Sequence, residues 1–280
     1  MTFITTTSVR RTVGISTSEI SDDDVTAIIA ECEPQIERSF NTKFTPTEKI
    51  DIIEGNGTSR LMLSKNPLLV VRELKINGST EDPAHLNLYK ESGKIVLNQD
   101  EDLTNSTFKT GATRVVVKYL YGFMEESSTS STTSAAEVAG TDVSIALASI
   151  TDFADADWVE IKGMDGLSEV AQINATPGAG AIVVDKLIYG HVSGSTVTKL
   201  EISPIMTKLM NYACAISMVA RIVGQSYTDI VGYGLGEFNV QKGEPYTQWR
   251  ETATQLVKER DLLMGNSKIQ GILKPRSYIA

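Results

Sequence analysis

Hydrophobic and polar positions follow two different periods along the chain, and the change of period separates helical from extended segments. From Ile20, apolar residues recur every three or four positions, which is typical of an amphipathic helix and continues to Phe40. The same spacing returns from Ile205 to Val223, after a serine and a proline suited to a helix start, and again over Tyr246–Met264.

Between Phe44 and Phe123 the apolar residues alternate with polar ones, which indicates strands. Turn residues such as GNG at Gly55–Gly57 and ING at Ile76–Gly78 separate the runs. This part of the chain is expected to be a small antiparallel β region. The candidate strands are Glu48–Gly55, Ser59–Ser64, Leu68–Gly78, Asn87–Ser92, Lys94–Asn98 and Thr113–Phe123.

The next segment, Ser127–Ser134, is a run of serine and threonine without an apolar period, and we interpret it as a flexible linker. Beyond it, Val143–Leu200 holds about five short strand patterns separated by glycine and aspartate. Such a density of short strands is typical of a compact barrel or sandwich inserted as a unit.

These patterns predict an α+β fold: a helical core with a small antiparallel β region, plus an inserted small all-β barrel or sandwich domain. We expect the core over residues 1–126 and 202–265, the linker over 127–134, the inserted β domain over 135–201 and a C-terminal tail over 266–280.

Three consecutive aspartates, Asp22, Asp23 and Asp24, precede the first helical run and raise the question of a metal or catalytic site. Ser21 can cap a helix with its hydroxyl, and Asp24 three residues later completes a capping box. Asp22 and Asp23 then face the positive end of the helix dipole. The triplet therefore has a structural explanation as a helix start.

Composition narrows the classes of function. The 280 residues are 41% hydrophobic and carry a formal net charge of -9, which argues against a surface that grips nucleic acid through many phosphates. The only cysteines, Cys32 and Cys214, lie in apolar helical patterns and are expected to be buried free thiols. No stretch of about 18 apolar residues occurs, and we expect a soluble, unexported protein that does not contact membrane.

Catalytic motifs are sparse. GYGLGEF lacks the spacing of a phosphate-binding loop and is interpreted as an interhelical loop. Asp152, Asp155 and Asp157 could bind calcium through oxygen ligands or form a turn before the next strand. His191 has no obvious acid or nucleophile partner in sequence. We therefore expect no enzyme and no cofactor; a metal-dependent carbohydrate-binding or hydrolytic module using these aspartates is the alternative.

The C-terminal tail combines apolar and basic residues and contains no acid, the opposite sign to the rest of the chain. Such a segment can order on a partner through apolar anchors and cations; a frayed terminus is the alternative. The candidate docking residues are Lys268, Ile269, Ile272, Leu273, Lys274, Pro275, Arg276 and Tyr278.

The order of three segments resembles the head-tail connector (adaptor) proteins of long-tailed double-stranded DNA bacteriophages. The segments are the capped helix start SEISDDD, the strand pattern L-x-x-x-P-L-x-x-V-x-x-L-x-x-N-G ending at Gly78, and V-x-Y-x-x-G ending at Gly122. The resemblance covers Val13–Phe123, with weaker support from Ile202–Gly265.

The resemblance implies a structural virion protein at the head-tail interface, made in the host cytoplasm, that forms a ring, usually a dodecamer, under the portal after DNA packaging. It implies that the C-terminal tail of the chain binds the portal protein and that the opposite side of the ring binds a tail-completion or tail-terminator protein. It also implies that DNA passes through the lumen of the ring without specific binding. Another phage tail-completion or baseplate adaptor protein is the alternative. The insert departs from the family's short form.

Overall fold

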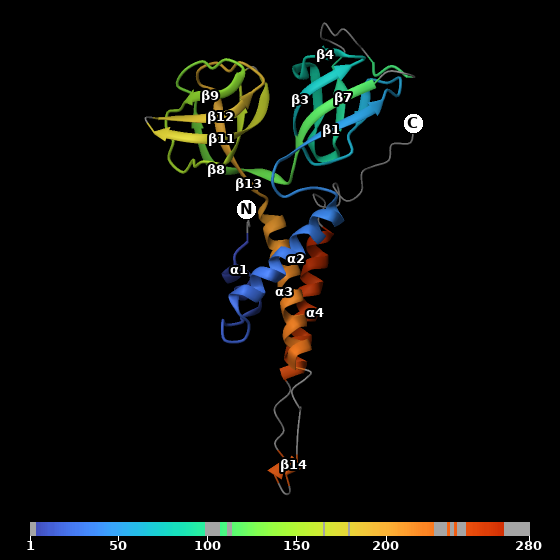
Figure 1. Ribbon diagram of the computed structural model, residues 1–280, viewed down its shortest axis with the longest axis vertical. Helices are drawn as coiled ribbons and strands as arrows, with labels where there is room; N and C mark the ends of the chain where they lie inside the picture. The colour runs from blue at the N-terminus through green and yellow to red at the C-terminus, as the bar shows by residue number, and fades with distance from the viewer. Residues whose placement is uncertain are drawn as a thin grey trace. The chain divides into compact units, whose positions relative to one another are not determined.

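The computed structural model describes residues 4–98, 107–110, 114–164, 166–178, 180–226, 234–235, 238–239 and 245–265. The chain divides into two compact units (Figure 1). A helical unit contains the described residues of 4–40 and 204–265, and a β unit contains those of 41–203.

The helical unit is built on α1 (Thr6–Val13), α2 (Asp22–Phe40), α3 (Pro204–Ser226) and α4 (Pro245–Met264). Helix α3 is the most apolar, and its buried side chains face all three other helices. Its seam with α4 is formed by Tyr212, Ala215, Val219 and Leu256. In the sequence between α3 and α4, β14 (Gly234–Leu235) pairs with β15 (Phe238–Asn239).

The first half of the β unit contains two antiparallel sheets that share one core. One sheet has the strand order β1-β7-β3-β4, and the other has the order β2-β6-β5. Apolar side chains on alternate positions of these strands form a single buried cluster, in which Leu74, Ile76, Val115 and Val117 are fully shielded. The strands are β1 (Thr47–Glu54), β2 (Arg60–Met62), β3 (Leu68–Ile76), β4 (Ser79–Glu81), β5 (Leu86–Tyr89), β6 (Lys94–Leu97) and β7 (Arg114–Tyr121).

The second half of the β unit is a six-stranded antiparallel sheet with the order β8-β13-β10-β11-β12-β9. The chain leaving β8 bridges Thr133 to Leu147 just beyond β9, so the sheet closes into a barrel and its edges are paired. The strands are β8 (Met124–Thr132), β9 (Gly140–Ala146), β10 (Trp158–Lys162), β11 (Ser168–Gly178), β12 (Ala181–Leu187) and β13 (Thr196–Ile202).

A second hydrophobic cluster joins the barrel to the first half of the β unit. Leu69, Val70 and Leu120 of β3 and β7 pack with Val170 and Leu200 of the barrel. Beside them, the nearly buried guanidinium of Arg72 donates to Asp185 at 2.8 Å. The barrel is therefore packed against its neighbour through both apolar contacts and a shielded ion pair.

The expected fold class is wrong. The chain is mostly β, with 40% of its residues in strands and 30% in helices, and one sheet has six strands. The predicted small β region is not an appendage of a helical core, because it shares a hydrophobic cluster with the barrel. The alternation within single strands could be recognised in the sequence, but the packing of two strand groups on each other could not.

The interpretation of Ser127–Ser134 as a flexible linker is also wrong, because Met124–Thr132 is strand β8. Its partners are backbone groups of β13, in a register that places Thr132 opposite Thr196 and Ser130 opposite Thr198. Threonine is β-branched and suits a strand, and the barrel supplies the hydrogen bonds that a sequence pattern cannot show. Among the helices in the described part of the chain, none is long and apolar enough to cross a membrane.

Candidate functional site

In the acidic run at the start of α2, the side chains of Asp22 and Asp24 bond to nearby residues of the same chain. The Asp24 N–H donates to Ser21 Oγ at 3.1 Å, and the Ser21 hydroxyl donates to Asp24 Oδ2 at 2.6 Å. The reciprocal contact thus involves the Ser21 hydroxyl, whereas the expected capping box uses its backbone N–H. Asp22 accepts two hydrogen bonds from the buried guanidinium of Arg10, and Asp23 lies in the first turn.

Two of the three aspartates considered as calcium ligands, Asp155 and Asp157, have side chains that bond to turns around β10, and the backbone carbonyl of the third, Asp152, accepts from Lys199. Asp155 Oδ1 accepts from the backbone N–H and hydroxyl of Thr176 at 2.7 and 2.8 Å. Asp157 Oδ2 accepts from Ala154 N–H at 2.8 Å and pairs with Lys199 at 2.9 Å. Within the described ranges, no group of three His, Cys, Asp or Glu side chains is arranged to hold a metal ion. These contacts support the turn interpretation.

The predicted docking residues of the tail, Lys268, Ile269, Ile272, Leu273, Lys274, Pro275, Arg276 and Tyr278, lie outside the described residues. The position of this segment is therefore still a prediction.

Strand β1 carries an exposed apolar surface that the sequence analysis did not identify. Its burial alternates, so Lys49, Asp51 and Ile53 point toward the core while Glu48, Ile50, Ile52 and Glu54 point outward. The side chains of Ile50 and Ile52 are 55% and 58% exposed. The signal was present in the sequence, because three isoleucines within Ile50–Ile53 place apolar side chains on both faces of one strand.

The residues around the two isoleucines extend the same outer face across the sheet. Ile52 lies opposite the half-buried Val116 on β7, and Ile50 lies opposite Lys118. Lys118 pairs with Glu48 at 3.0 Å. An apolar centre with charged neighbours of both signs is the composition expected of a protein–protein contact.

The backbone of β1 is available for pairing on one side. In the strand order of its sheet, β1 is at the end and has β7 as its hydrogen-bonded neighbour. Within the part of the chain that the structure describes, no strand pairs with its other edge. An edge of this length presents a row of donors and acceptors that can pair with another strand.

Beneath β1, a buried carboxylate fixes the strand to the core. Asp51 accepts hydrogen bonds from the Ser64 N–H, the Ser64 hydroxyl and the Tyr119 hydroxyl, at 2.7, 2.8 and 2.8 Å. Burial alone would raise the pKa of Asp51, but these three donors outweigh it and hold the pKa below its ordinary value. The exposed isoleucines are thus carried on a strand that is held rigidly from within.

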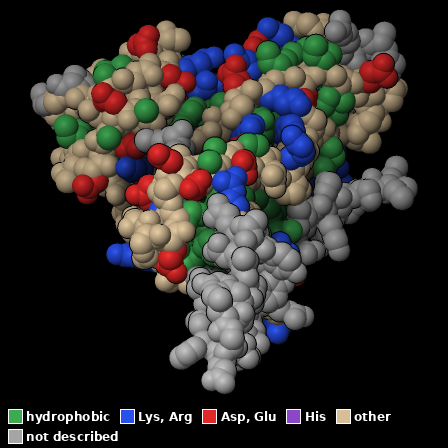
Figure 2. Space-filling model, turned by 60° about the horizontal axis from the view of Figure 1, so that its bottom comes forward, with side chains coloured by type: hydrophobic (Ala, Val, Ile, Leu, Met, Phe, Trp, Pro, Cys, Tyr) green, Lys and Arg blue, Asp and Glu red, His purple; other side chains and the backbone are tan. Residues whose placement is uncertain are grey.

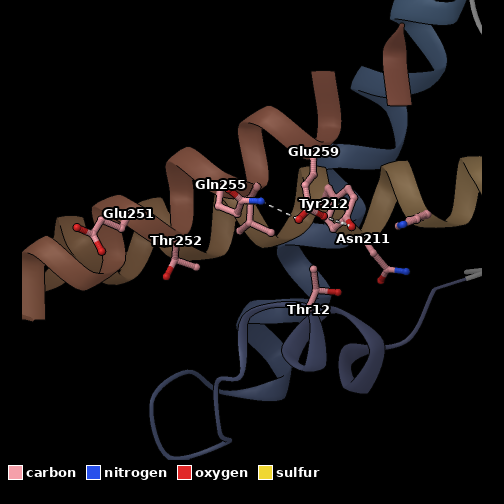
Figure 3. Close-up of a pocket in the computed structure, with 9 residues that line it drawn as sticks. Thr12, Asn211, Tyr212, Glu251, Thr252, Gln255 and Glu259 are labelled. Carbon is pink, nitrogen blue, oxygen red and sulfur yellow. Dashed lines mark hydrogen bonds between the residues drawn. The ribbon is translucent and has the colours of Figure 1, made fainter. Parts of the chain in front are cut away.

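The helical unit contains an open groove of about 660 Å³ between α1, α3 and α4 (Figure 3). The Tyr212 hydroxyl donates to Glu259, which also accepts from Gln255 at 3.0 Å. The hydrogen bond to Glu259 raises the pKa of Tyr212 to about 12. Since its principal side chains bond to one another, we interpret the groove as part of the packing between the helices.

The sequence analysis also missed a buried acid–imidazole pair in the barrel. His191 and Glu169 are shielded from solvent and lie 2.6 Å apart, Nε2 to Oε1. Glu169 also accepts from the backbone N–H groups of Ile188 and Tyr189. Because the carboxylate is engaged with backbone groups, it has a structural role that fixes the chain after β12.

Comparison with protein-family models finds no match, and comparison with curated proteins finds none either.

Proposed function

We propose that this chain is a non-enzymatic structural protein of a bacteriophage virion that forms a ring at the head-tail joint. In this proposal the chain binds the portal protein through its C-terminal tail after DNA packaging. A different surface of the chain receives the tail of the phage. The observation that carries the assembly role is the exposed pair Ile50 and Ile52, beside the free edge of β1. The kind of assembly comes from the resemblance to head-tail connectors.

The segments that carry the resemblance form well-defined elements in this structure. SEISDDD leads into α2, which begins at Asp22. The second segment contains β3 and the third contains the second half of β7; the two strands are neighbours in one sheet, with Leu74 opposite Val117 and Val71 opposite Tyr119. The motifs therefore correspond to a capped helix and a strand pair, which supports treating them as structural landmarks.

The charge distribution is compatible with DNA passing through a ring. The chain has a net charge of -9, and Lys and Arg side chains lie interspersed with Asp and Glu side chains on the face drawn in Figure 2. Strong binding to phosphates needs a concentrated positive surface. A lumen lined by this mixed or acidic surface would let DNA slide.

The proposal is tested by mixing the purified chain with the portal protein encoded in the same genome, and by electron microscopy of the complex and of intact virions. A ring of the full-length chain under the portal is expected. A chain ending at Gly265 is expected to lose portal binding, because it lacks every candidate docking residue of the tail. Equal portal binding by the two chains would refute the tail assignment, and density located elsewhere in the virion would refute the head-tail position.

A further inference from the structure

The free edge of β1 carries a specific side-chain pattern. On its outer face two carboxylates, Glu48 and Glu54, are six residues apart and flank the exposed Ile50 and Ile52. A strand that pairs with this edge gains backbone hydrogen bonds whatever its sequence. The side chains add a preference for a strand with two cations six residues apart and an apolar residue between them.

The chain contains such a segment in its C-terminal tail. Lys268 and Lys274 are six residues apart, with Ile272 between them and Pro275 immediately after. Proline has no N–H to donate, so a paired segment would end before Pro275. The tail also has no acidic residue that would repel Glu48 or Glu54.

One antiparallel register matches both ends of the two segments. It places Lys274 opposite Glu48 and Lys268 opposite Glu54, and it places Ile272 opposite Ile50. At the alternate positions, Gly271 falls opposite Asp51, whose carboxylate is already bonded inward, and Ile269 falls opposite the half-buried Ile53. The same register places Gln270 opposite Ile52 and Leu273 opposite Lys49. Every pairing already present in this sheet is antiparallel, so the added strand continues the pattern.

We propose that residues Lys268–Lys274 of a neighbouring copy add to the free edge of β1 as an antiparallel strand. The choice of a second copy rests on the proposed ring, because a contact between two different surfaces of identical subunits repeats from copy to copy and closes a ring when the rotation permits. Residues Pro275–Ala280 extend past the added strand. Arg276 and Tyr278 are then left for the portal.

A charge exchange tests the register. Glu54→Lys and Lys268→Glu each place like charges opposite one another, and each is expected to weaken self-association by roughly three- to tenfold in analytical ultracentrifugation. The double variant restores opposite charges and is expected to recover most of the association. Glu91→Lys, the same change at an exposed glutamate away from β1, is the control. Unchanged association in both single variants, or no recovery in the double variant, overturns the register.

A mixing experiment tests whether the strand comes from a second copy. Ile50→Lys damages the edge and keeps the tail, whereas a chain ending at Gly265 keeps the edge and lacks the tail. Neither is expected to assemble alone, and the mixture is expected to form a one-to-one complex. Val192→Lys, at a side chain of similar exposure, 52% against 55%, controls for the new charge. Failure of the mixture to form a complex, or assembly of the chain ending at Gly265, overturns the proposal.

A chain ending at Lys274, which lacks Arg276 and Tyr278, separates this inference from the proposed function. It retains the whole matching segment, so its self-association is expected to equal that of the full chain even though its portal binding is lost. Loss of self-association on removal of Pro275–Ala280 would overturn the strand proposal. Intact self-association together with unchanged portal binding would leave the strand contact standing and refute a portal contact at Arg276 and Tyr278.

Discussion

Glu169 and His191 form a fully buried pair in which the imidazole Nε2 lies 2.6 Å from a carboxylate oxygen. The two residues are 22 positions apart, on β11 and on the segment that follows β12. The same carboxylate holds the N–H groups of Ile188 and Tyr189. One side chain thus fixes both the histidine and the backbone that leads toward β13.

Replacing Glu169 with alanine is expected to destabilise the barrel by about 3–5 kcal/mol, because several buried donors lose their acceptor together. Urea unfolding followed by the fluorescence of Trp158, which lies on β10, measures the change in a Trp249→Phe background. Glu201→Ala on β13 removes an exposed carboxylate and should change stability by less than about 0.5 kcal/mol. Similar effects of the two substitutions would contradict a structural role for the buried pair.

Asp51 should make the stability of the first half of the β unit depend on pH. Hydrogen bonds from Ser64 and Tyr119 overcome the effect of burial and lower its pKa in the folded protein. A lowered pKa stabilises the fold above the unfolded value of about 3.9, and this contribution is lost as the pH falls through the folded value.

Asp51→Asn is therefore expected to lower the free energy of unfolding by about 2–3 kcal/mol at pH 7, where the charged acceptor is lost. The difference from the natural chain should shrink below about pH 4, because the natural carboxyl then becomes protonated. Urea midpoints from pH 7 to pH 3 measure this trend. Asp23→Asn, at an exposed residue, is the control, and a difference that is constant over the whole range would contradict the prediction.

The two cysteines are expected to differ in reactivity. Cys214 donates a hydrogen bond to Cys32, and the sulfur of Cys32 lies 3.4 Å from Ser217 Oγ. The Cys214 contact lowers the pKa of Cys32 and raises that of Cys214. Since the thiolate is the nucleophile, iodoacetamide should label Cys32 before Cys214 in the folded protein.

Peptide mass spectrometry over a labelling time course measures this order. Cys214→Ala should slow the labelling of Cys32 more than Ser217→Ala does, because the Cys214 hydrogen bond is the larger influence on the Cys32 pKa and alanine cannot donate it. Equal labelling rates for the two natural cysteines would show that the thiols do not interact as the structure indicates.

Deletion of Ser127–Ser134 distinguishes a strand from a linker. Removing a flexible linker would leave the stability of the barrel almost unchanged, but removing most of β8 opens the barrel and exposes the edges of β13 and β9. We expect rapid proteolysis within residues 140–202 and loss of the cooperative unfolding of the barrel. Replacement of the same eight residues by alternating threonine and serine should preserve both, because the backbone pairing is retained.

Local features of the fold could be predicted from the sequence. The start of α2 was readable because a capping serine and acidic first turn act within four residues, and the structure begins that helix at Asp22. The strand pattern from Leu68 likewise matches β3, whose alternation follows from one buried face. Each of these signals depends on neighbours in the chain alone.

Features that depend on distant partners could not be predicted. Strand β8 has polar side chains throughout Glu125–Thr132, and its hydrogen-bond partner β13 begins more than sixty residues later. Leu120 and Leu200 are equally remote in sequence, yet they belong to one hydrophobic cluster that joins the two halves of the β unit. The exposure of Ile50 and Ile52 likewise depends on tertiary structure, because β1 is an end strand of its sheet with β7 as its neighbour.

The two ends of the barrel meet, because Met124 at its first strand is the register partner of Ile202 at its last. The chain therefore enters and leaves the barrel at nearly the same point, directly after β7 and directly before α3. A segment bounded in this way can be gained or lost by a single recombination event without breaking the path of the chain from β7 to α3. Relatives of this protein could thus differ by an entire barrel while keeping the same β7-to-α3 junction.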